Sequence, residues 1–478
     1  MGLILNPDVK LRPDGGRAIL FSANQADSIE DPIFRFLYPQ HAVMLSLFDG
    51  QRDLFEIKEA VAYLFNMDSH TASEGVEILL DLPVNMEKTI RSLIGDASTI
   101  NPKKARVYNP NSFIVPSDKV DMSDIRCKKP CSLLVLPTMR CVTSCIYCYA
   151  NREGFQEQPE FGLPLYKRLL REAKECGIET IEFSGGDLFC REDAFDFIEC
   201  TLAEGMYLNI PTKYPLSRDH VNRLAAMGLS TIQISVDAFS PAIIDKMVAR
   251  SGYGKKILKT LNFLGEAGIQ VRTNTVLTPC NIKDAATLAR HLAQMPHTLK
   301  SNFTPYGRSL YRHHDDLFCS SNDLHEFETE LNKIKEEFPH KNLFMSGSAV
   351  DPYSGDADQR ASAFWERAMC TANRRGVVVL PNGKVTICEE LYLHKEFIIG
   401  DLTNQTLMEV WNSPKALELA HPNQSAVPDG PCKGCSDFYR CHEERGRCYR
   451  ETLKAYGYDK SHWPDPRCPR APVGNRMA

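Results

Sequence analysis

The sequence has 478 residues, a mass of 53.9 kDa and a formal net charge of −5 at pH 7. A soft prior of about 100–200 residues per domain predicts two or three domains. Hydrophobic residues make up 43% and charged residues 24% of the chain, which is typical of a folded globular protein and excludes disordered and collagen-like classes. The near-neutral charge gives no broad electrostatic signature of nucleic-acid or anionic-membrane binding, so we expect neither partner.

The seventeen cysteines are predicted to be reduced. No stretch reaches the roughly 18 apolar residues of a membrane helix, and the first residues lack the basic start and apolar run of a signal peptide. We therefore expect a cytoplasmic protein. A disulfide framework is typical of small secreted chains, so these thiols indicate metal or redox chemistry instead.

Residues 1–110 are predicted to form a small helical module. A helix over 54–64 is indicated by apolar residues on one face: Leu54, Ile57, Ala60, Val61 and Leu64. Thr71 and Glu74 have capping-box spacing ahead of a second helix, and a further helix is expected to end at Gly95. Residues 96–130 are interpreted as a linker or an edge segment, with the linker itself assigned to 111–130.

From residue 131 to about 345, short apolar runs alternate with longer amphipathic ones. Six strands are predicted, at 133–136, 180–183, 207–210, 232–236, 271–277 and 300–304. Four glycines follow the helical stretches, where positive φ ends a helix: Gly177, Gly205, Gly228 and Gly268. The alternation predicts an α/β fold with parallel strands, an open or partial (β/α)6 barrel. Ligands bind beyond the carboxyl ends of the strands in such folds.

Cys141, Cys145 and Cys148 lie in the loop after the first predicted barrel strand. Their C-x3-C-x2-C spacing is expected by chance roughly 0.02 times in a chain with this cysteine content. A [4Fe–4S] cluster normally binds four thiolates, so three on one loop leave one iron open to a non-protein ligand. A zinc or structural site is the alternative, although three thiolates need a fourth ligand to complete a tetrahedron.

This motif, with Tyr147 before its last cysteine, resembles the signature of radical S-adenosylmethionine (SAM) enzymes, and the resemblance covers about residues 130–345. It implies that the amino and carboxylate groups of SAM chelate the open iron. It also implies that an electron from the cluster cleaves SAM to methionine and a 5′-deoxyadenosyl radical, which then takes a hydrogen atom from the substrate.

The second predicted strand ends in Ser184-Gly185-Gly186-Asp187, which is similar to the GGE motif of the same family. The resemblance implies that this turn and Tyr147 contact SAM, with Asp187 where the family has Glu. Glycines suit the turn because bulky side chains would block close approach of the backbone to a ligand. Taken alone, a Ser-Gly-Gly turn is an ordinary loop.

The fourth predicted strand ends in I-S-V-D-A, residues 234–238, which resembles the S-x-D-G element of peptide-modifying members. The resemblance places Ser235 near SAM and makes Arg250 a candidate contact for the SAM carboxylate. Asp237 is assigned either to SAM or substrate binding or to capping of the next helix.

After about residue 345 the alternation stops, and seven cysteines fall within residues 370–468. Residues 377–387 are predicted to form a hairpin, because Asn382-Gly383 joins two apolar runs. The hairpin brings Cys388 back beside its first strand. We assign residues 346–478 to a separate cysteine-rich domain organised by metal.

The seven cysteines resemble a SPASM domain, the extension of radical SAM enzymes that binds two auxiliary [4Fe–4S] clusters. The resemblance assigns one auxiliary cluster to Cys370, Cys388 and Cys448, and the other to Cys432, Cys435, Cys441 and Cys468. The implied cofactors are therefore SAM and three [4Fe–4S] clusters. The first auxiliary cluster either keeps an open iron or takes a non-cysteine ligand. Structural zinc sites are the alternative, because C-x2-C alone does not distinguish zinc from iron–sulfur.

Two further residues are candidates for catalysis. Some SPASM enzymes place an acidic base directly after the cysteine that corresponds to Cys388, so the resemblance indicates Glu389, with a solvated acidic pair as the alternative. Cys190 follows the SAM turn, where its thiol could return a hydrogen atom to a substrate radical. The other unassigned cysteines are expected to be buried as small hydrophobic residues. The run His313-His314-Asp315-Asp316 is expected to be a solvated loop.

The N-terminal module resembles the winged-helix domain with which many peptide-modifying radical SAM enzymes hold a leader peptide as an added strand. We therefore predict a ribosomal-peptide maturase that oxidises a C–H bond of a precursor peptide with a leader segment. The product is a crosslink, with a thioether as the first expectation and C–C or C–O bonds as others. A flavodoxin or ferredoxin is the expected electron donor. The alternatives are a peptide epimerase, a formylglycine-forming sulfatase maturase and, from another class, a non-catalytic zinc-binding scaffold.

Overall fold

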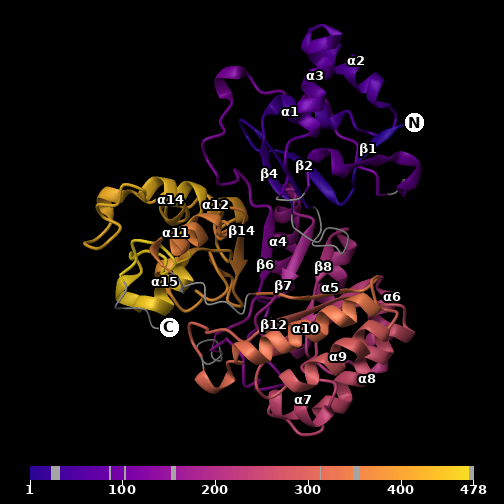
Figure 1. Ribbon diagram of the computed structural model, residues 1–478, viewed down its shortest axis with the longest axis vertical. Helices are drawn as coiled ribbons and strands as arrows, with labels where there is room; N and C mark the ends of the chain where they lie inside the picture. Colours follow the sequence, from indigo (N-terminus) through magenta and orange to yellow (C-terminus); the bar gives the residue numbers. More distant parts are fainter. Residues whose placement is uncertain are drawn as a thin grey trace. The chain divides into compact units, whose positions relative to one another are not determined.

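The computed structural model describes residues 1–22, 33–85, 88–101, 104–151, 158–312, 314–347 and 356–472. The chain divides into two compact units, Met1–Lys129 and Pro130–Ala478 (Figure 1). His313 lies outside the described residues. In the described part of the chain, no helix is both long and apolar enough to cross a membrane.

The first unit contains a three-stranded antiparallel sheet that the sequence did not predict. Its strands, in the order β2-β3-β4, are Val9–Pro13, Ala18–Ser22 and Phe34–Leu37. A second ladder pairs β1 (Leu3–Leu5) with β5 (Ile94–Asp96). The predicted helix ending at Gly95 is wrong: buried Ile90 and Leu93 have helical spacing but span a single 3-10 turn before β5 begins.

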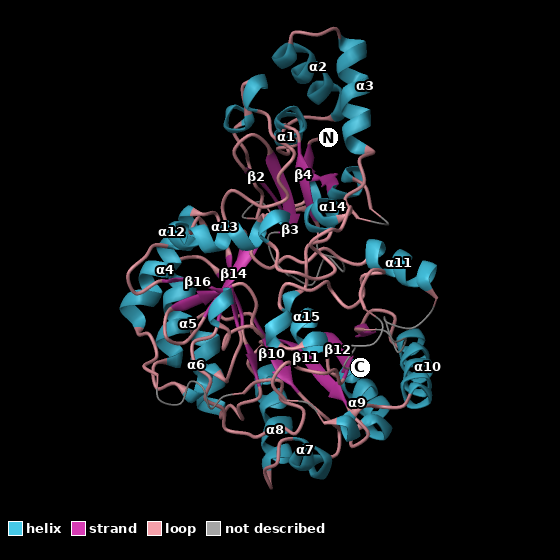
Figure 2. Ribbon diagram, turned by 90° about the vertical axis from the view of Figure 1, so that its left-hand side faces the viewer, coloured by secondary structure: helices cyan, strands magenta, loops and turns pink. Residues whose placement is uncertain are grey.

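Three helices accompany this sheet: α1 (Pro39–Ser46), α2 (Leu54–Phe65) and α3 (Ser69–Leu80) (Figure 2). The predicted helix over 54–64 is confirmed as α2, whose Ile57 and Val61 side chains are fully buried. The capping role predicted for Thr71 and Glu74 is wrong. Asp68 caps α3 instead, because its carboxylate stands three residues earlier and accepts the Thr71 N–H at 2.9 Å.

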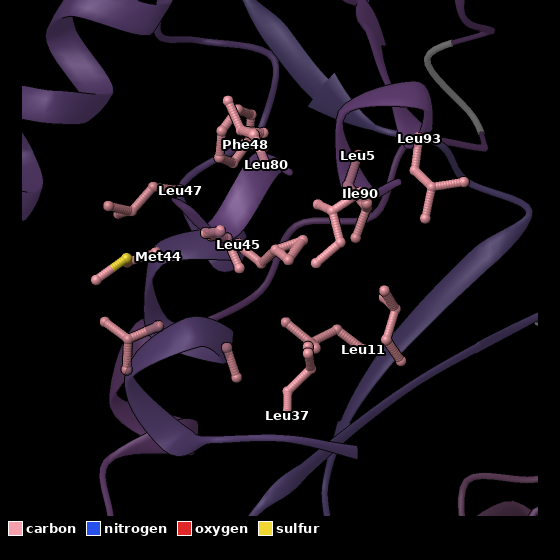
Figure 3. Packing of buried hydrophobic residues seen from close by; sticks show 14 of the residues in the cluster. Leu5, Leu11, Leu37, Met44, Leu45, Leu47, Phe48, Leu80, Ile90 and Leu93 are labelled. Atoms are coloured by element: carbon pink, nitrogen blue, oxygen red, sulfur yellow. The ribbon is translucent and has the colours of Figure 1, made fainter. Parts of the chain in front are cut away.

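The core of the first unit joins the sheet to α1 and α3. Figure 3 shows Leu11 and Leu37 of the sheet in this core with Leu45 of α1 and Leu80 of α3. The segment assigned to a linker is tied to the same unit, because the buried Arg17 guanidinium donates to the carbonyl of Arg126 at 2.8 Å. The unit therefore extends to Lys129.

All six predicted barrel strands are confirmed in the second unit. The parallel strands fall into two sheets. One contains β6 (Ser132–Val135), β7 (Thr180–Phe183) and β8 (Tyr207–Asn209). The other contains β9 (Pro211–Thr212), β10 (Thr231–Ser235), β11 (Gln270–Leu277), β12 (Thr298–Pro305) and β13 (Asn342–Met345). Only Ile210 separates β8 from β9. The additional strand β13 escapes prediction because Leu343 is the only buried residue of its four.

Helices connect these strands as the alternation predicts. They are α4 (Leu163–Glu175), α5 (Ala194–Ala203), α6 (Arg218–Ala226), α7 (Pro241–Met247), α8 (Tyr253–Glu266), α9 (Ile282–Gln294) and α10 (Ser321–Glu337). Figure 2 shows α8 and α9 beside the strands that they contact, β11 and β12. The four glycines predicted to end helices have φ between 71° and 85°, so they adopt the left-handed conformation that the prediction requires.

The predicted hairpin of the C-terminal region is confirmed as β14 (Gly376–Val379) and β15 (Lys384–Thr386), which pair antiparallel. β15 pairs in turn with β16 (Ile398–Asp401). β14 lies parallel to β6, so the hairpin extends the sheet of β6, β7 and β8, and the cysteine-rich region belongs to the same compact unit. The remaining helices are α11 (Ala357–Glu366), α12 (Leu407–Trp411), α13 (Pro414–Ala420), α14 (Phe438–Glu444) and α15 (Tyr449–Tyr456).

Candidate active site

The cysteine loop leaves the carboxyl end of β6 and carries three half-buried thiols: Cys141, Cys145 and Cys148. Backbone hydrogen bonds attach the loop to the end of α7. The N–H of Ser144 donates to the carbonyl of Val248 at 3.2 Å, and the N–H of Ile146 donates to that of Met247 at 2.9 Å. The loop is therefore held by the barrel on both sides of Cys145.

The turn after β7 packs directly on the chain that leads into this loop. The N–H of Gly186 donates to the carbonyl of Thr138, and the N–H of Asp187 to that of Arg140, both at 2.8 Å. A Cβ atom on Gly186 would lie 2.3 Å from the Arg140 carbonyl oxygen, and Gly185 has a φ of 93°. The glycines are thus required for close approach to the protein's own backbone.

The Asp187 carboxylate is buried and points to the end of the neighbouring strand. It accepts hydrogen bonds from the Thr212 hydroxyl at 2.8 and 2.9 Å and from the Lys213 N–H at 2.9 Å. Burial raises the pKa of Asp187, and these hydrogen bonds act in the opposite direction. In this structure the carboxylate links β7 to β9, rather than standing open to a ligand as the resemblance implies.

Tyr147, Asp237 and Lys213 form a polar cluster beside the loop, in which Asp237 is fully buried and the other two side chains are partly buried. The Tyr147 hydroxyl donates to Asp237 Oδ1 at 2.6 Å, and Lys213 Nζ lies 2.6 Å from Asp237 Oδ2 and also bonds the Tyr147 hydroxyl. Asp237 does not cap the next helix, because the N-cap of α7 is Ser240. Lys213 is missing from the predicted site. Its position directly after β9 could have indicated it from the sequence, since ligand-binding residues concentrate at the carboxyl ends of parallel strands.

The other two predicted SAM contacts have different surroundings. Ser235 is the last residue of β10 and lies opposite Asn274 of β11, so it stands at the carboxyl ends of the strands. The Arg250 guanidinium donates to the carbonyl of Val142 in the cysteine loop. Arg250 therefore holds the loop backbone in this structure.

Glu389 reaches from the C-terminal region to the turn after β7. Its Oε2 accepts a hydrogen bond from the Ser184 hydroxyl at 2.8 Å and a longer one from the Tyr149 hydroxyl at 3.5 Å. Burial raises the pKa of Glu389, while the Ser184 hydrogen bond lowers it. Glu182, two residues before Ser184, has its pKa raised to about 7, first by burial and then by the charge of Glu389. Sequence reasoning missed Glu182, which alternates with the buried apolar residues of β7.

Three C-terminal thiols lie near one another: Cys370, Cys388 and Cys448. Burial raises the pKa of Cys388 to about 12 and that of Cys448 to about 11, and in each case another thiol of the three adds to the effect. Glu390 is buried here and pairs with Arg450 at 2.9 Å. Neither Glu389 nor Glu390 is a solvated acid, so that alternative is wrong.

The other four C-terminal cysteines line a single cavity: Cys432, Cys435, Cys441 and Cys468. Arg447, Asp465 and Phe438 complete part of its wall. Burial raises the pKa of Cys441 to about 11 and that of Cys468 to about 12. Four soft thiol ligands around one cavity are the donor set that an iron–sulfur cluster requires.

Cys190 ends a 3-10 turn, Leu188–Cys190, and is half-buried near Arg140. Asp315, in the run expected to be a solvated loop, forms an exposed ion pair with Arg308 at 3.2 Å. Among the residues that the structure describes, no three His, Cys, Asp or Glu side chains are grouped so that they could hold a single metal ion.

Two family models match the chain. Residues 135–292 match the radical SAM superfamily, and residues 370–436 match SPASM, an iron–sulfur cluster-binding domain. The chain therefore contains a radical SAM domain followed by a SPASM domain.

Named relatives and a solved structure extend this likeness. The PqqA peptide cyclase of Gluconobacter oxydans (strain 621H) is 24% identical over 356 residues, which are 73% of this chain and 93% of the relative. The probable GTP 3',8-cyclase of Methanopyrus kandleri is 28% identical over 236 residues, 47% of this chain and 74% of the relative. Streptococcus suis SuiB bound to precursor peptide SuiA has a TM-score of 0.64 at 15% identity, covering 97% of this chain and 98% of that one. This last likeness shows a shared fold.

The radical SAM domain implies a [4Fe–4S] cluster and SAM, and the SPASM domain implies auxiliary iron–sulfur clusters. The residues present fit these groups. Three thiols share one strand-end loop beside a glycine turn, and two further sets of thiols are gathered in the C-terminal region.

Proposed function

We propose that this enzyme oxidises a C–H bond of a ribosomally made peptide and closes a crosslink within that peptide. A thioether is the first expectation, with C–C and C–O bonds as the others. The observation that carries the proposal is the Glu389 carboxylate, 2.8 Å from the Ser184 hydroxyl, which brings an acid of the SPASM region to the turn proposed to bind SAM. The relative named PqqA peptide cyclase supports a peptide substrate and ring closure.

The proposed cluster ligands follow the three groups of thiols. Cys141, Cys145 and Cys148 would hold the SAM cluster. The proposed auxiliary sets are Cys370, Cys388 and Cys448, and Cys432, Cys435, Cys441 and Cys468. When bound, the first cluster and SAM supply the 5′-deoxyadenosyl radical that takes a hydrogen atom from the substrate.

The proposed SAM contacts are Tyr147, Ser184, Gly185, Gly186 and Ser235, at the carboxyl ends of the strands or in the cysteine loop. Asp187 and Arg250 support this surface, since Asp187 bonds Thr212 and Arg250 bonds the loop carbonyl of Val142. Their proposed role is to hold the turn after β7 and the cysteine loop in position.

Glu389 is the proposed proton acceptor. Oxidation of a C–H bond removes a proton as well as electrons, and the buried Glu389 carboxylate has a raised pKa, which makes it a better base than a solvated acid. The Ser184 and Tyr149 hydroxyls orient Oε2. Cys190 is the proposed hydrogen-atom donor in the epimerase alternative.

We also propose that the first unit holds the leader segment of the precursor peptide as an added strand at an edge of the sheet β2-β3-β4. Its three helices and small antiparallel sheet are the elements of a winged-helix domain. SuiB, which shares the fold, was crystallised with its precursor peptide SuiA.

A flavodoxin or ferredoxin is the proposed electron donor. The seventeen cysteines, all within the described residues, form no disulfide, so a reducing, cytoplasmic location is proposed.

The test is co-expression of the enzyme with a peptide encoded beside its gene, followed by mass spectrometry of that peptide. A crosslink lowers the peptide mass by one pair of hydrogen atoms and suppresses fragmentation between the joined residues. Deuterium uptake from solvent without this mass loss indicates the epimerase. A carbonyl that reacts with hydrazides indicates the sulfatase maturase, and an unchanged peptide with a colourless, zinc-filled protein indicates the scaffold.

A further inference from the structure

A mostly buried lysine lies against the cysteine loop. Lys213 follows β9 directly, and its side chain is only 12% exposed. Its Nζ lies 2.6 Å from Asp237 Oδ2 and 4.8 Å from the centre of the Tyr147 ring, and it also bonds the Tyr147 hydroxyl. Because Tyr147 lies between Cys145 and Cys148, these contacts place the ammonium group beside the loop thiols.

Lys213 keeps its positive charge in this position. The Asp237 carboxylate lies 2.6 Å from Lys213 Nζ and favours the charged form of the lysine. The Tyr147 hydroxyl donates to Asp237 Oδ1 at 2.6 Å, so it holds the other oxygen of the same carboxylate. These three side chains therefore carry one positive charge, on Lys213, and one carboxylate, on Asp237. Both groups contact Tyr147, which lies between Cys145 and Cys148.

The charge matters because reduction adds one negative charge to an iron–sulfur cluster. The reduction potential of such a cluster depends on nearby charge, hydrogen bonds and exposure to solvent. In a buried site, where little water screens the interaction, a neighbouring cation favours the reduced form and a neighbouring anion favours the oxidised form. Lys213 and Asp237 should therefore act on the potential with opposite signs.

We propose that Lys213 is a positioning residue for reduction: its ammonium group, held by Asp237 and Tyr147, raises the reduction potential of the cluster bound by Cys141, Cys145 and Cys148. The inference rests on the proposed assignment of these three cysteines. In this arrangement the Lys213 cation makes the iron–sulfur cluster easier to reduce, and the Asp237 carboxylate partly offsets that effect.

The test is a redox titration of the full-length, anaerobically reconstituted enzyme, followed by electron paramagnetic resonance without SAM. The signal of the loop cluster is the one that changes when SAM is then added. Lys213→Met should shift the reduction equilibrium of this signal at least tenfold toward the oxidised form, which is about 59 mV for one electron. Asp237→Asn should shift the midpoint in the opposite direction.

Three further variants make the test specific. Lys213→Arg keeps the charge and should remain near the parent midpoint, and the double variant Lys213→Met/Asp237→Asn should return toward it. Lys341→Met is the matched control. Lys341 is also partly buried and donates to the carbonyls of Met295 and Thr298 at 2.7 and 3.1 Å, next to the amino ends of β12 and β13, so the midpoint should not move.

The outcomes separate the inference from the assignment on which it rests. A parent protein with no SAM-sensitive signal overturns the assignment of the three cysteines and the inference with it. A normal signal whose midpoint is unchanged in Lys213→Met overturns the inference alone, and so does a loss of SAM affinity without a shift. Shifts of the same sign in Lys213→Met and Asp237→Asn indicate general disturbance of the loop and also overturn it. If Lys213→Met fails to bind iron, the Asp237→Asn variant decides: a raised midpoint potential supports the inference, and an unchanged or lowered midpoint overturns it.

Discussion

Glu389 joins two parts of the sequence that lie 205 residues apart, because its carboxylate accepts the Ser184 hydroxyl. The local pattern does not distinguish Glu389 from Glu390, since both follow the same strand. The structure separates them: Glu390 pairs with Arg450 and Lys454, whereas Glu389 faces the turn. Which of two adjacent acids points into the site depends on where β15 lies, and that placement is set by long-range pairing that local periodicity does not contain.

Replacing Glu389 with Gln should separate SAM cleavage from product formation. The variant keeps an oxygen for the Ser184 hydroxyl but loses the base, so peptide crosslinking should fall by about 10²–10⁴-fold. Formation of 5′-deoxyadenosine should stay within a few fold of the parent, because the cysteine loop is unchanged. Chromatography with mass spectrometry measures both products. Glu396→Gln, at an exposed position of the same region, is the control, and full crosslinking by the Glu389→Gln variant would contradict the proposed base.

The raised pKa of Glu182 predicts that the free energy of unfolding depends on pH. Its pKa rises from 4.5 to about 7 on folding, mainly through burial and the charge of Glu389, with Arg272 acting in the opposite direction. A carboxyl group whose folded pKa is raised contributes stability below its unfolded pKa, and this contribution is lost as pH rises through the folded value. The shift corresponds to about 3 kcal/mol as an upper limit.

The Glu182→Gln variant, which cannot ionise, should therefore melt at a higher temperature than the parent at pH 8. The difference should nearly vanish at pH 4, below the unfolded pKa of 4.5, because the parent side chain is then mostly protonated in both the folded and the unfolded state. Thermal unfolding followed by circular dichroism at the two pH values measures the effect, with Glu396→Gln as the control. An equal difference at both pH values would rule out the ionisation of Glu182 as the cause.

Among the elements, the barrel strands were predictable and the N-terminal sheet was not. The barrel strands are short apolar runs separated by long amphipathic helices, so two periodicities alternate along the chain. In the first unit, β3 is a run of four buried residues without alternation, which periodicity does not distinguish from a short helix. The start of α3 shows the same limit, because both Asp68 and Thr71 are acceptable caps and only the hydrogen bond to the Thr71 N–H decides between them.

The pairing of β14 with β6 depends on a glycine, which gives an element-scale prediction. A Cβ atom on Gly376 would lie 2.2 Å from Ser132 Oγ and 2.5 Å from the Ser132 carbonyl oxygen. Gly376→Val should therefore destabilise the enzyme by about 1–3 kcal/mol and displace the hairpin that positions Glu389. Thermal melting should show the loss of stability, and crosslinking should fall further than SAM cleavage.

Gly307→Val is the matched control for this substitution, because a Cβ atom at Gly307 meets no other atom within 4 Å. Equal effects of the two substitutions would indicate that general β-branching, and not the contact with Ser132, is responsible.

For the molecule as a whole, the parallel pairing of β14 with β6 places all ten proposed cluster cysteines in one compact unit. The Asn-Gly turn predicts the hairpin, but its position beside the barrel depends on strands far apart in the sequence. The spacing of the C-terminal cysteines likewise predicts metal chemistry without showing which thiols share a site. The cavity lined by Cys432, Cys435, Cys441 and Cys468 provides that grouping.

This grouping leads to a prediction of metal content. Three [4Fe–4S] clusters correspond to about twelve iron atoms per chain, and the Cys432→Ala/Cys435→Ala variant should retain about eight. Its SAM cleavage should persist, because the cysteine loop and the glycine turn are unchanged, while peptide crosslinking should fall. Iron and acid-labile sulfide assays measure the iron content.

Cys319→Ala is the matched control, because this half-buried thiol belongs to none of the three sets and its loss should leave the iron content intact. If the double variant instead lost zinc, or lost iron from all three sets at once, the four cysteines around the cavity would not form an independent cluster site. The SPASM region would then act through folding of the whole second unit.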